Sequence, residues 1–411
     1  MLNCRADSLR NGVSNPAAFF DDIRTYSIMT DMVRHRKSLP LAHAFDLIRL
    51  NQSSDPKDKV YGLLGILDYL EVHGLPSVDY TGSVQHLYHD MTRTILQNDQ
   101  GLHILYMIGL RPTVSGLPTW VPDYSNTAFI RFIDTGDNTA SAHSSADFTF
   151  AILDRSLSVS GVMIDNIDLQ ASSTSVCTAD FRQGFAARSD LSTIDERHTA
   201  VTQLIQTLRS WIAISGMMEN YPTGEEPSTA FYNIMTQSLL PGSQSWSIHS
   251  SPKPKRDVFQ KWLSIMTADL SQDPTQFHSD FDNIKSDPNS VAIVKDYIRL
   301  FGCSDNPRDW TAELQIRLLL RACDQALSTL QHDVSILSYQ RTFFTTRDGY
   351  MGVGPRSARP TDYIVLIAGL QLPFIMRKAG QKYNLIGPAY IYGVMKGERW
   401  NSELAQKITL V

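Results

Sequence analysis

The pattern of apolar and polar positions predicts helices over most of the first 335 residues. The clearest case runs from about Ser83 to Gln97, where the apolar residues recur every three or four positions on one face. A second such pattern covers Val201 to Ile212, and a third, strongly apolar on one side, covers Trp310 to Leu330. We expect residues 1–335 to form a mainly helical body, with residues 170–335 as its second helical region.

The hydrophobic period changes at two places. Phe148 and Phe150 alternate with polar residues, as do Leu157 and Val159 after a polar turn, which predicts a β-hairpin from Phe148 to Val159. From about Ser338 onward, short apolar or alternating runs are separated by Gly or Pro, which is typical of closely spaced strands. The fold class predicted is therefore α+β: a mainly helical body with one β-hairpin, and a small C-terminal β-barrel-like module over residues 338–398.

Three stretches show no regular period. Residues 111–126 combine three prolines with Trp120 and Tyr124, and this composition predicts an ordered loop. Residues 132–147 are small and polar, which predicts a mobile surface loop. Residues 221–254 are rich in Pro and Gly, and we expect a loop-rich insertion around one short helix.

Charge and cysteine content narrow the class of protein. The 411 residues contain 37 Lys and Arg against 42 Asp and Glu, a formal net charge of −5, so we expect no nucleic-acid partner. The longest apolar run, Leu102 to Leu110, is about half of what a membrane span needs, and the first residues lack the apolar core of a secretory signal. Four cysteines without a CxxC pair indicate neither a zinc site nor a disulfide framework. We expect a cytoplasmic protein with no membrane span.

Standard catalytic signatures are absent from the sequence. There is no GxSxG elbow, no phosphate-binding GxxxxGK[ST] loop and no HExxH helix, and the glycines of MGVGPR at 351–356 lead into a proline rather than a helix. His86 and His89 lie three residues apart and could share a metal ion, but no third ligand can be identified, so a solvated helix face is the favoured interpretation. We expect no cofactor and no metal.

Several candidate residues have a structural and a functional interpretation. Asp55 and Asp58 could form an acid–base pair, although capping of a helix start is favoured. Cys303 and Cys323 lie near apolar helical faces and are interpreted as core residues. In the loop LPTWVPDYS, Trp120 could line a pocket wall or fill the core, and Asp123 could make a turn hydrogen bond.

Four segments together resemble fungal heterokaryon-incompatibility (HET) domain proteins. SSDPKDKVYGLLGILD at 53–68 is similar to the family's S/T-D-P-R/K-D-K signature, and VDYTGSVQHLYHDMTRTIL at 78–96 to the helix that follows it. LPTWVPDYS at 117–125 resembles the family's LPSWVPDW segment, and residues 341–398 resemble its C-terminal module. The resemblance implies that residues 53–125 correspond to the C-terminal part of a HET domain.

Two departures from the family pattern stand out. The N-terminal half of the HET domain, with its Y-x-A-L-S-Y-x-W-G pattern, has no match in the residues before Ser53. If the death-signalling activity of the family depends on that half, we expect this chain to lack it. Thr361-Asp362 stands where the family has Gly-Asp, which we interpret as a minor change to a turn.

The resemblance implies two functions. HET-like proteins occur in fungal secondary-metabolite clusters, where some resemble cofactor-free cyclases of the Diels–Alder type. Recruitment as such a pericyclase implies a small hydrophobic substrate, a terpenoid or a polyketide, held in an apolar cavity beside one or two hydrogen-bond donors. The alternative is a truncated incompatibility or cell-death signalling protein that acts through a protein partner.

For the enzyme, a ligand cavity is expected between the helical body and the β-module. Trp120 and Tyr124 are the predicted substrate-binding wall, because the proline-flanked loop holds them rigidly. Arg341 and Tyr350 are the predicted catalytic donors, because a guanidinium and a phenol can orient a substrate carbonyl or carboxylate.

Overall fold

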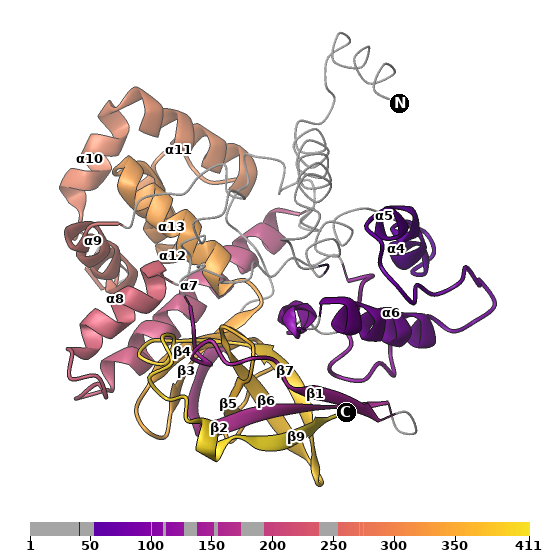
Figure 1. The fold of residues 1–411 in the computed structure, drawn as a ribbon. Helices are drawn as coiled ribbons and strands as arrows, with labels where there is room; N and C mark the ends of the chain where they lie inside the picture. Colours follow the sequence, from indigo (N-terminus) through magenta and orange to yellow (C-terminus); the bar gives the residue numbers. More distant parts are fainter. Residues whose placement is uncertain are drawn as a thin grey trace. The chain divides into compact units, whose positions relative to one another are not determined.

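The computed structural model describes residues 41, 53–99, 101–109, 112–126, 138–151, 155–173, 193–237, 254–270, 272–273 and 275–411. The chain divides into two compact units. Unit 1 comprises Met1–Phe129 with Asp180–Arg188, and unit 2 comprises Ile130–Ala179 with Ser189–Val411 (Figure 1). The boundary predicted near residue 338 falls inside unit 2, and a separable module there stays a prediction.

Unit 1 is helical in its described part. It contains α4 (Asp58–Tyr61), α5 (Leu64–Tyr69), α6 (Val84–Asp99) and the 3-10 helix η1 (His103–Met107). The apolar stripe of α6 is buried as its spacing predicts, with Met91 and Ile95 fully enclosed. Residues 112–126 form the ordered loop that their composition predicts.

The helices of unit 2 form a layer that contacts its sheet through α7 and β2. They are α7 (Ile194–Gly216), α8 (Pro227–Gln237), α9 (Arg256–Thr267), α10 (His278–Ser286), α11 (Pro288–Phe301), the 3-10 turn η3 (Pro307–Asp309), α12 (Ala312–Ala322) and α13 (Gln325–Ser338). A capping box of Thr193 and Glu196 starts α7. Trp211 on α7 and Trp262 on α9 are fully buried and anchor the helical core.

The predicted helix from Trp310 to Leu330 is wrong as a single element. Helix α12 ends at Ala322. Asp324 then accepts a hydrogen bond at 2.7 Å from the backbone N–H of Leu327, and this contact caps the start of α13. An aspartate at this position satisfies the free N–H groups of a new helix, and apolar periodicity does not report such a restart.

The strands of unit 2 form one mixed sheet. They are β1 (Phe148–Ala151), β2 (Ser156–Ser173), β3 (Arg341–Thr346), β4 (Met351–Pro355), β5 (Tyr363–Ile367), β6 (Pro373–Ala379), β7 (Lys382–Pro388), β8 (Tyr390–Ile391) and β9 (Gln406–Leu410), with a short 3-10 turn η4 (Ser402–Leu404) before the last. The strand order is β5-β6-β7-β9-β2-β3-β4-β8, and β5 also pairs with β2. The path β5-β6-β7-β9-β2 thus returns to β5, although β7 and β9 share only the pair Tyr383 and Leu410.

The α+β prediction is confirmed, and the sheet is larger than the predicted module. The predicted hairpin is present, and its register places Phe148 opposite Val159. However, β2 continues to Ser173, where residues 170–173 were expected to be helical. The first half of β2 pairs with β9 and β5, and its second half pairs with β3. The register of β2 shifts between Met163 and Asp165. β2 and β9 therefore complete the barrel-like sheet from outside residues 338–398.

The prediction of a mobile surface loop is wrong for residues 138–141, and residues 132–137 lie outside the described part. Ala140 is fully buried and donates its N–H to Gln371 O at 3.1 Å, while Thr139 donates to Met395 O at 2.8 Å. Small residues fit here because they pack closely against the sheet. The helices expected before residue 53 are also outside the described residues. In the described part of the chain, no helix is long and apolar enough to cross a membrane.

Candidate functional site

The first three HET-like segments meet around α6 in unit 1, and we call this group the motif cluster. Tyr88 on α6 donates its hydroxyl to Pro56 O at 2.7 Å, which ties the first segment to the helix. The Tyr88 ring lies 5.0 Å from that of Tyr124 in an edge-on contact, which ties in the third segment. The three segments are separate in the sequence, and the fold brings them together.

The first two segments bind each other through their polar groups. Lys57 Nζ donates to the backbone oxygen of Tyr80, and the Tyr80 hydroxyl donates to Asp58 Oδ1 at 2.6 Å. The Tyr61 hydroxyl donates to Asp79 O at 2.7 Å and accepts from the Asp79 N–H at 2.9 Å. Asp58 therefore holds Tyr80 instead of capping α4.

Asp55, in contrast, binds the local backbone. Its Oδ1 accepts a hydrogen bond at 2.8 Å from the N–H of Lys57 at the entry to α4. The two carboxylates thus have separate structural partners.

Tyr124 and Trp120, the predicted substrate wall, are fully buried in unit 1. The Tyr124 hydroxyl lies 2.8 Å from the Thr92 hydroxyl on α6, and Thr92 donates to Tyr88 O at 2.7 Å. Burial raises the pKa of Tyr124 well above its ordinary value, so the phenol stays neutral. The Trp120 ring lies 5.3 Å from the His89 ring. Their role in binding a substrate stays a prediction.

Asp123 organises the loop that carries these aromatics. Its Oδ2 accepts from the N–H groups of Thr113 at 2.6 Å and Val114 at 2.9 Å, and its Oδ1 accepts from the Ser125 hydroxyl at 2.6 Å. Burial opposes ionisation, but these hydrogen bonds outweigh it and hold the pKa of Asp123 below its ordinary value.

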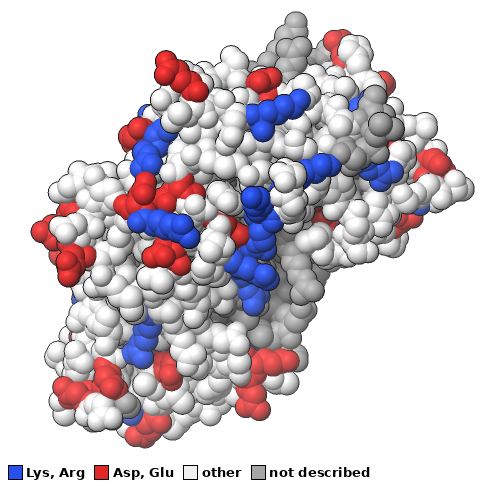
Figure 2. All heavy atoms as spheres, turned by 90° about the horizontal axis from the view of Figure 1, so that it is seen from below, with Lys and Arg blue, Asp and Glu red and all other residues white. Residues whose placement is uncertain are grey.

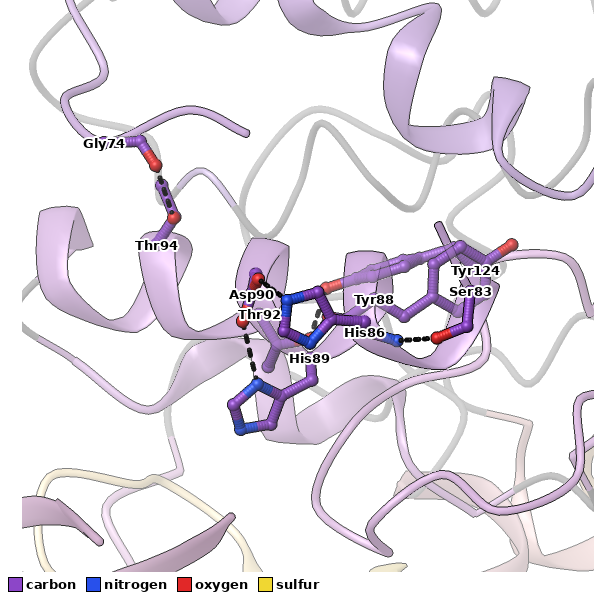
Figure 3. A network of polar contacts seen from close by, with 9 residues as sticks. All are labelled: Gly74, Ser83, His86, Tyr88, His89, Asp90, Thr92, Thr94 and Tyr124. Carbon is purple, nitrogen blue, oxygen red and sulfur yellow. Dashed lines mark hydrogen bonds and ion pairs between the residues drawn. The ribbon is translucent and has the colours of Figure 1, made fainter. Parts of the chain in front are cut away.

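Two histidines share one carboxylate on α6 (Figure 3). His86 Nε2 lies 3.1 Å from Asp90 Oδ2, and His89 Nδ1 lies 3.0 Å from Asp90 Oδ1. His86 is solvated, as its position predicts, but His89 is buried against Trp120, so the prediction of a solvated face is wrong for His89. The loop bearing Trp120 is distant in sequence, and helical periodicity could not reveal it. Within the described ranges, no group of three or more His, Cys, Asp or Glu residues could hold a metal ion.

The predicted donors Arg341 and Tyr350 lie in unit 2, at opposite ends of the β3–β4 hairpin. Arg341 pairs with Pro355, whereas Tyr350 follows the turn and its backbone oxygen accepts from Thr346 N–H. Tyr350 is level with Thr346, which lies five residues from Arg341 along β3. At roughly 3.4 Å per residue, the two positions are about 17 Å apart along the strand. Arg341 is buried and donates to Leu337 O at 3.2 Å. The hairpin does not bring the two groups to one reacting atom.

Tyr350 has neighbours that the sequence does not reveal. The Arg399 guanidinium lies 5.5 Å from the centre of its ring, and the Tyr221 ring meets it edge-on at 6.1 Å. Arg399 also donates to Asp348 Oδ2 at 3.0 Å and to Ile164 O at 3.1 Å. No sequence signal identifies Arg399, because it lies 51 positions from Asp348 and 235 from Ile164.

The described cysteines are only partly buried, so the interpretation as core residues is wrong in that neither is fully enclosed in the core. Burial raises the pKa of Cys303, and it raises the pKa of Cys323 to about 12. Both thiols therefore stay protonated at neutral pH.

Comparison with known proteins gives two matches. Residues 311–411 match the family model of the Het-6 beta-barrel domain. The chain is also similar to the heterokaryon incompatibility protein 6, OR allele, of Neurospora crassa, with 37% identity over 125 residues, which cover 27% of this chain and 17% of that protein. No solved structure matches.

These matches agree with the sequence motifs and with the closed strand path of unit 2. They support a relationship to HET-type proteins that carry a Het-6 β-barrel domain, and the similarity to that domain is located in residues 311–411. The aligned region spans about a sixth of the Neurospora relative.

Proposed function

We propose that the chain acts in heterokaryon incompatibility through protein–protein contacts, not through conversion of a small molecule. The observation that carries this proposal is the motif cluster. Its polar groups, such as Lys57 with Tyr80 and Tyr61 with Asp79, are bound to one another. They stabilise a module and are not directed at a reacting atom. The name of the Neurospora relative supports the same function.

The surface beside these contacts also suits a protein partner. Val78 is 61% exposed and Tyr80 is 53% exposed, in the segment that the cluster holds in place. Large apolar side chains that are held rigidly at the surface are frequent in protein interfaces. The exposed ring of Tyr80 is fixed by its hydrogen bond to Asp58.

The test is a fusion assay. The chain is expressed in a panel of fungal strains of different genotype, and the viability of fused cells is scored with a vital dye. We expect loss of viability in at least one pairing and recovery with Val78→Asp. Leu404→Asp, which places the same charge at a 64% exposed apolar site in unit 2, is the matched control and should behave like the parent. Full viability in every pairing, or equal recovery with both variants, contradicts the proposal.

A second candidate is the cofactor-free cyclase of the Diels–Alder type, acting on a terpenoid or a polyketide. The observation that favours it is the half-buried Tyr350 beside the Arg399 guanidinium, since a phenol next to a cation is a strong hydrogen-bond donor. A linear polyene from the same gene cluster serves as substrate. Tyr350→Phe should slow turnover by about 10- to 1000-fold.

Two further variants complete the cyclase test. Arg341→Ala should slow turnover if that group contacts the substrate, and Trp120→Ala should change the product ratio, with folding checked by circular dichroism. If the parent protein forms no cyclic product, the cyclase candidate is rejected.

A further inference from the structure

Three cations lie on neighbouring segments of the barrel-like sheet, and we call this group the basic end. Arg356 and Arg359 lie in the loop before β5, and Lys378 lies near the end of β6. The pairing places these segments together, because Tyr363 opens β5 opposite Met376 of β6. All three cations are exposed.

A buried ion pair holds the loop of the basic end in place. Arg377 on β6 donates Nε to Asp362 Oδ1 at 2.8 Å and a terminal nitrogen to Asp362 Oδ2 at 2.7 Å, and it also donates to Ser357 O at 2.8 Å. Asp362 Oδ2 accepts from the N–H of Arg359 at 2.8 Å as well. The loop is therefore fixed against β6 by one bidentate contact.

The segment that carries the basic end contains little negative charge. Asp362 is the single acidic residue between positions 349 and 397 of the sequence, where six Lys and Arg occur. Asp362 is only 2% exposed and already paired with Arg377. Among the described residues, the side chains of these three cations have no hydrogen-bond or ion-pair partner. The nearest acids on the paired strand are Asp165 and Asp168 of β2.

Two tyrosines add apolar surface between these cations. Tyr383 pairs directly with Lys378, so both side chains lie on one face of the sheet. The Tyr363 and Tyr383 rings meet edge-on at 5.8 Å. Figure 2 shows Lys and Arg side chains on one face of the molecule, with Asp and Glu side chains among them.

We propose that the basic end binds an acidic peptide segment of a partner protein. Arg forks bind carboxylates with two parallel hydrogen bonds, and Arg and Tyr are enriched in protein interfaces. The net charge of −5 over the whole chain repels a nucleic acid, whose charge density is far higher than that of a peptide. This inference rests on the proposed function through protein contacts and specifies one partner chemistry.

The test uses the full chain and a fluorescein-labelled ten-residue peptide of alternating Glu and Tyr. Fluorescence anisotropy gives the affinity, and the same peptide with Gln in place of Glu is the neutral control. We expect binding of the Glu peptide only, with a loss at 0.5 M salt because the contacts are screened. Arg359→Glu and Lys378→Glu should each weaken binding about 3- to 10-fold.

A matched variant separates the basic end from general charge effects. Lys255→Glu makes the same charge change at an exposed position in unit 2 before α9, and it should leave the affinity unchanged. An equal loss with Lys255→Glu, equal binding of the Gln peptide, or tighter binding of a twenty-residue oligothymidine each overturns the proposal. If the peptide binds as expected but fused cells stay viable, the proposed function fails and the binding site stands.

Discussion

Replacing Thr361 by glycine should stabilise unit 2. Thr361 has a φ of +73°, in the left-handed region that a β-branched residue rarely adopts. Its N–H donates to Ile167 O at 2.8 Å and its oxygen accepts from Asn166 at 3.1 Å, so the fold holds the backbone there. The side chain is exposed, and its removal leaves these two contacts in place.

The magnitude follows from two opposing terms. The left-handed conformation costs an L-residue about 1–2 kcal/mol, which glycine does not incur. Glycine loses more backbone entropy on folding, a cost of about 0.5–1 kcal/mol. The net gain in unfolding free energy is about 0.5–1 kcal/mol, or an increase of about 1–4 °C in Tm for a unit of this size.

The assay is urea unfolding followed by circular dichroism, with Thr361→Asn expected to fall between threonine and glycine because asparagine tolerates this region. Thr149 is the control, since it lies in strand β1, where Thr→Gly should destabilise by about 1 kcal/mol. If Thr361→Gly lowers the unfolding midpoint as much as Thr149→Gly does, the strain argument is refuted.

Three further outcomes follow from buried polar groups. Arg377→Ala should lower the unfolding free energy by about 3 kcal/mol, because the substitution leaves the carboxylate of Asp362 buried without its partner. Arg377→Lys should restore only part of this free energy. A loss under about 1 kcal/mol for Arg377→Ala in urea unfolding contradicts the prediction. The pKa of Asp123 is lowered in the folded state, so its carboxylate contributes stability above the unfolded pKa and loses it as pH falls. The stability difference between the parent and Asp123→Asn should therefore shrink below about pH 4 in unfolding curves, and a constant difference argues against the hydrogen bonds. Cys323, with its pKa raised to about 12, should react with a thiol reagent at pH 8 only after urea is added, as peptide mass spectrometry can show; rapid labelling of the folded chain would disagree.

The sequence by itself determined the elements that depend on local spacing. The apolar stripe of α6, the hairpin from Phe148 to Val159 and the change to strands near Ser338 were all predicted, because each needs only neighbours within a few residues. The family resemblance was also readable, since its motifs are short and contiguous, and the matches to known proteins agree with it.

Only the tertiary structure decided which distant residues meet. β2 and β9 complete the sheet through pairings across the chain, and the left-handed turn at Thr361 is held by contacts to β2. The same applies to the candidate residues. Trp120 covers His89, while Arg341 and Tyr350 lie at opposite ends of one hairpin. Periodicity reports which face of an element is buried, but it carries no information on what covers that face, because non-local packing depends on all elements at once.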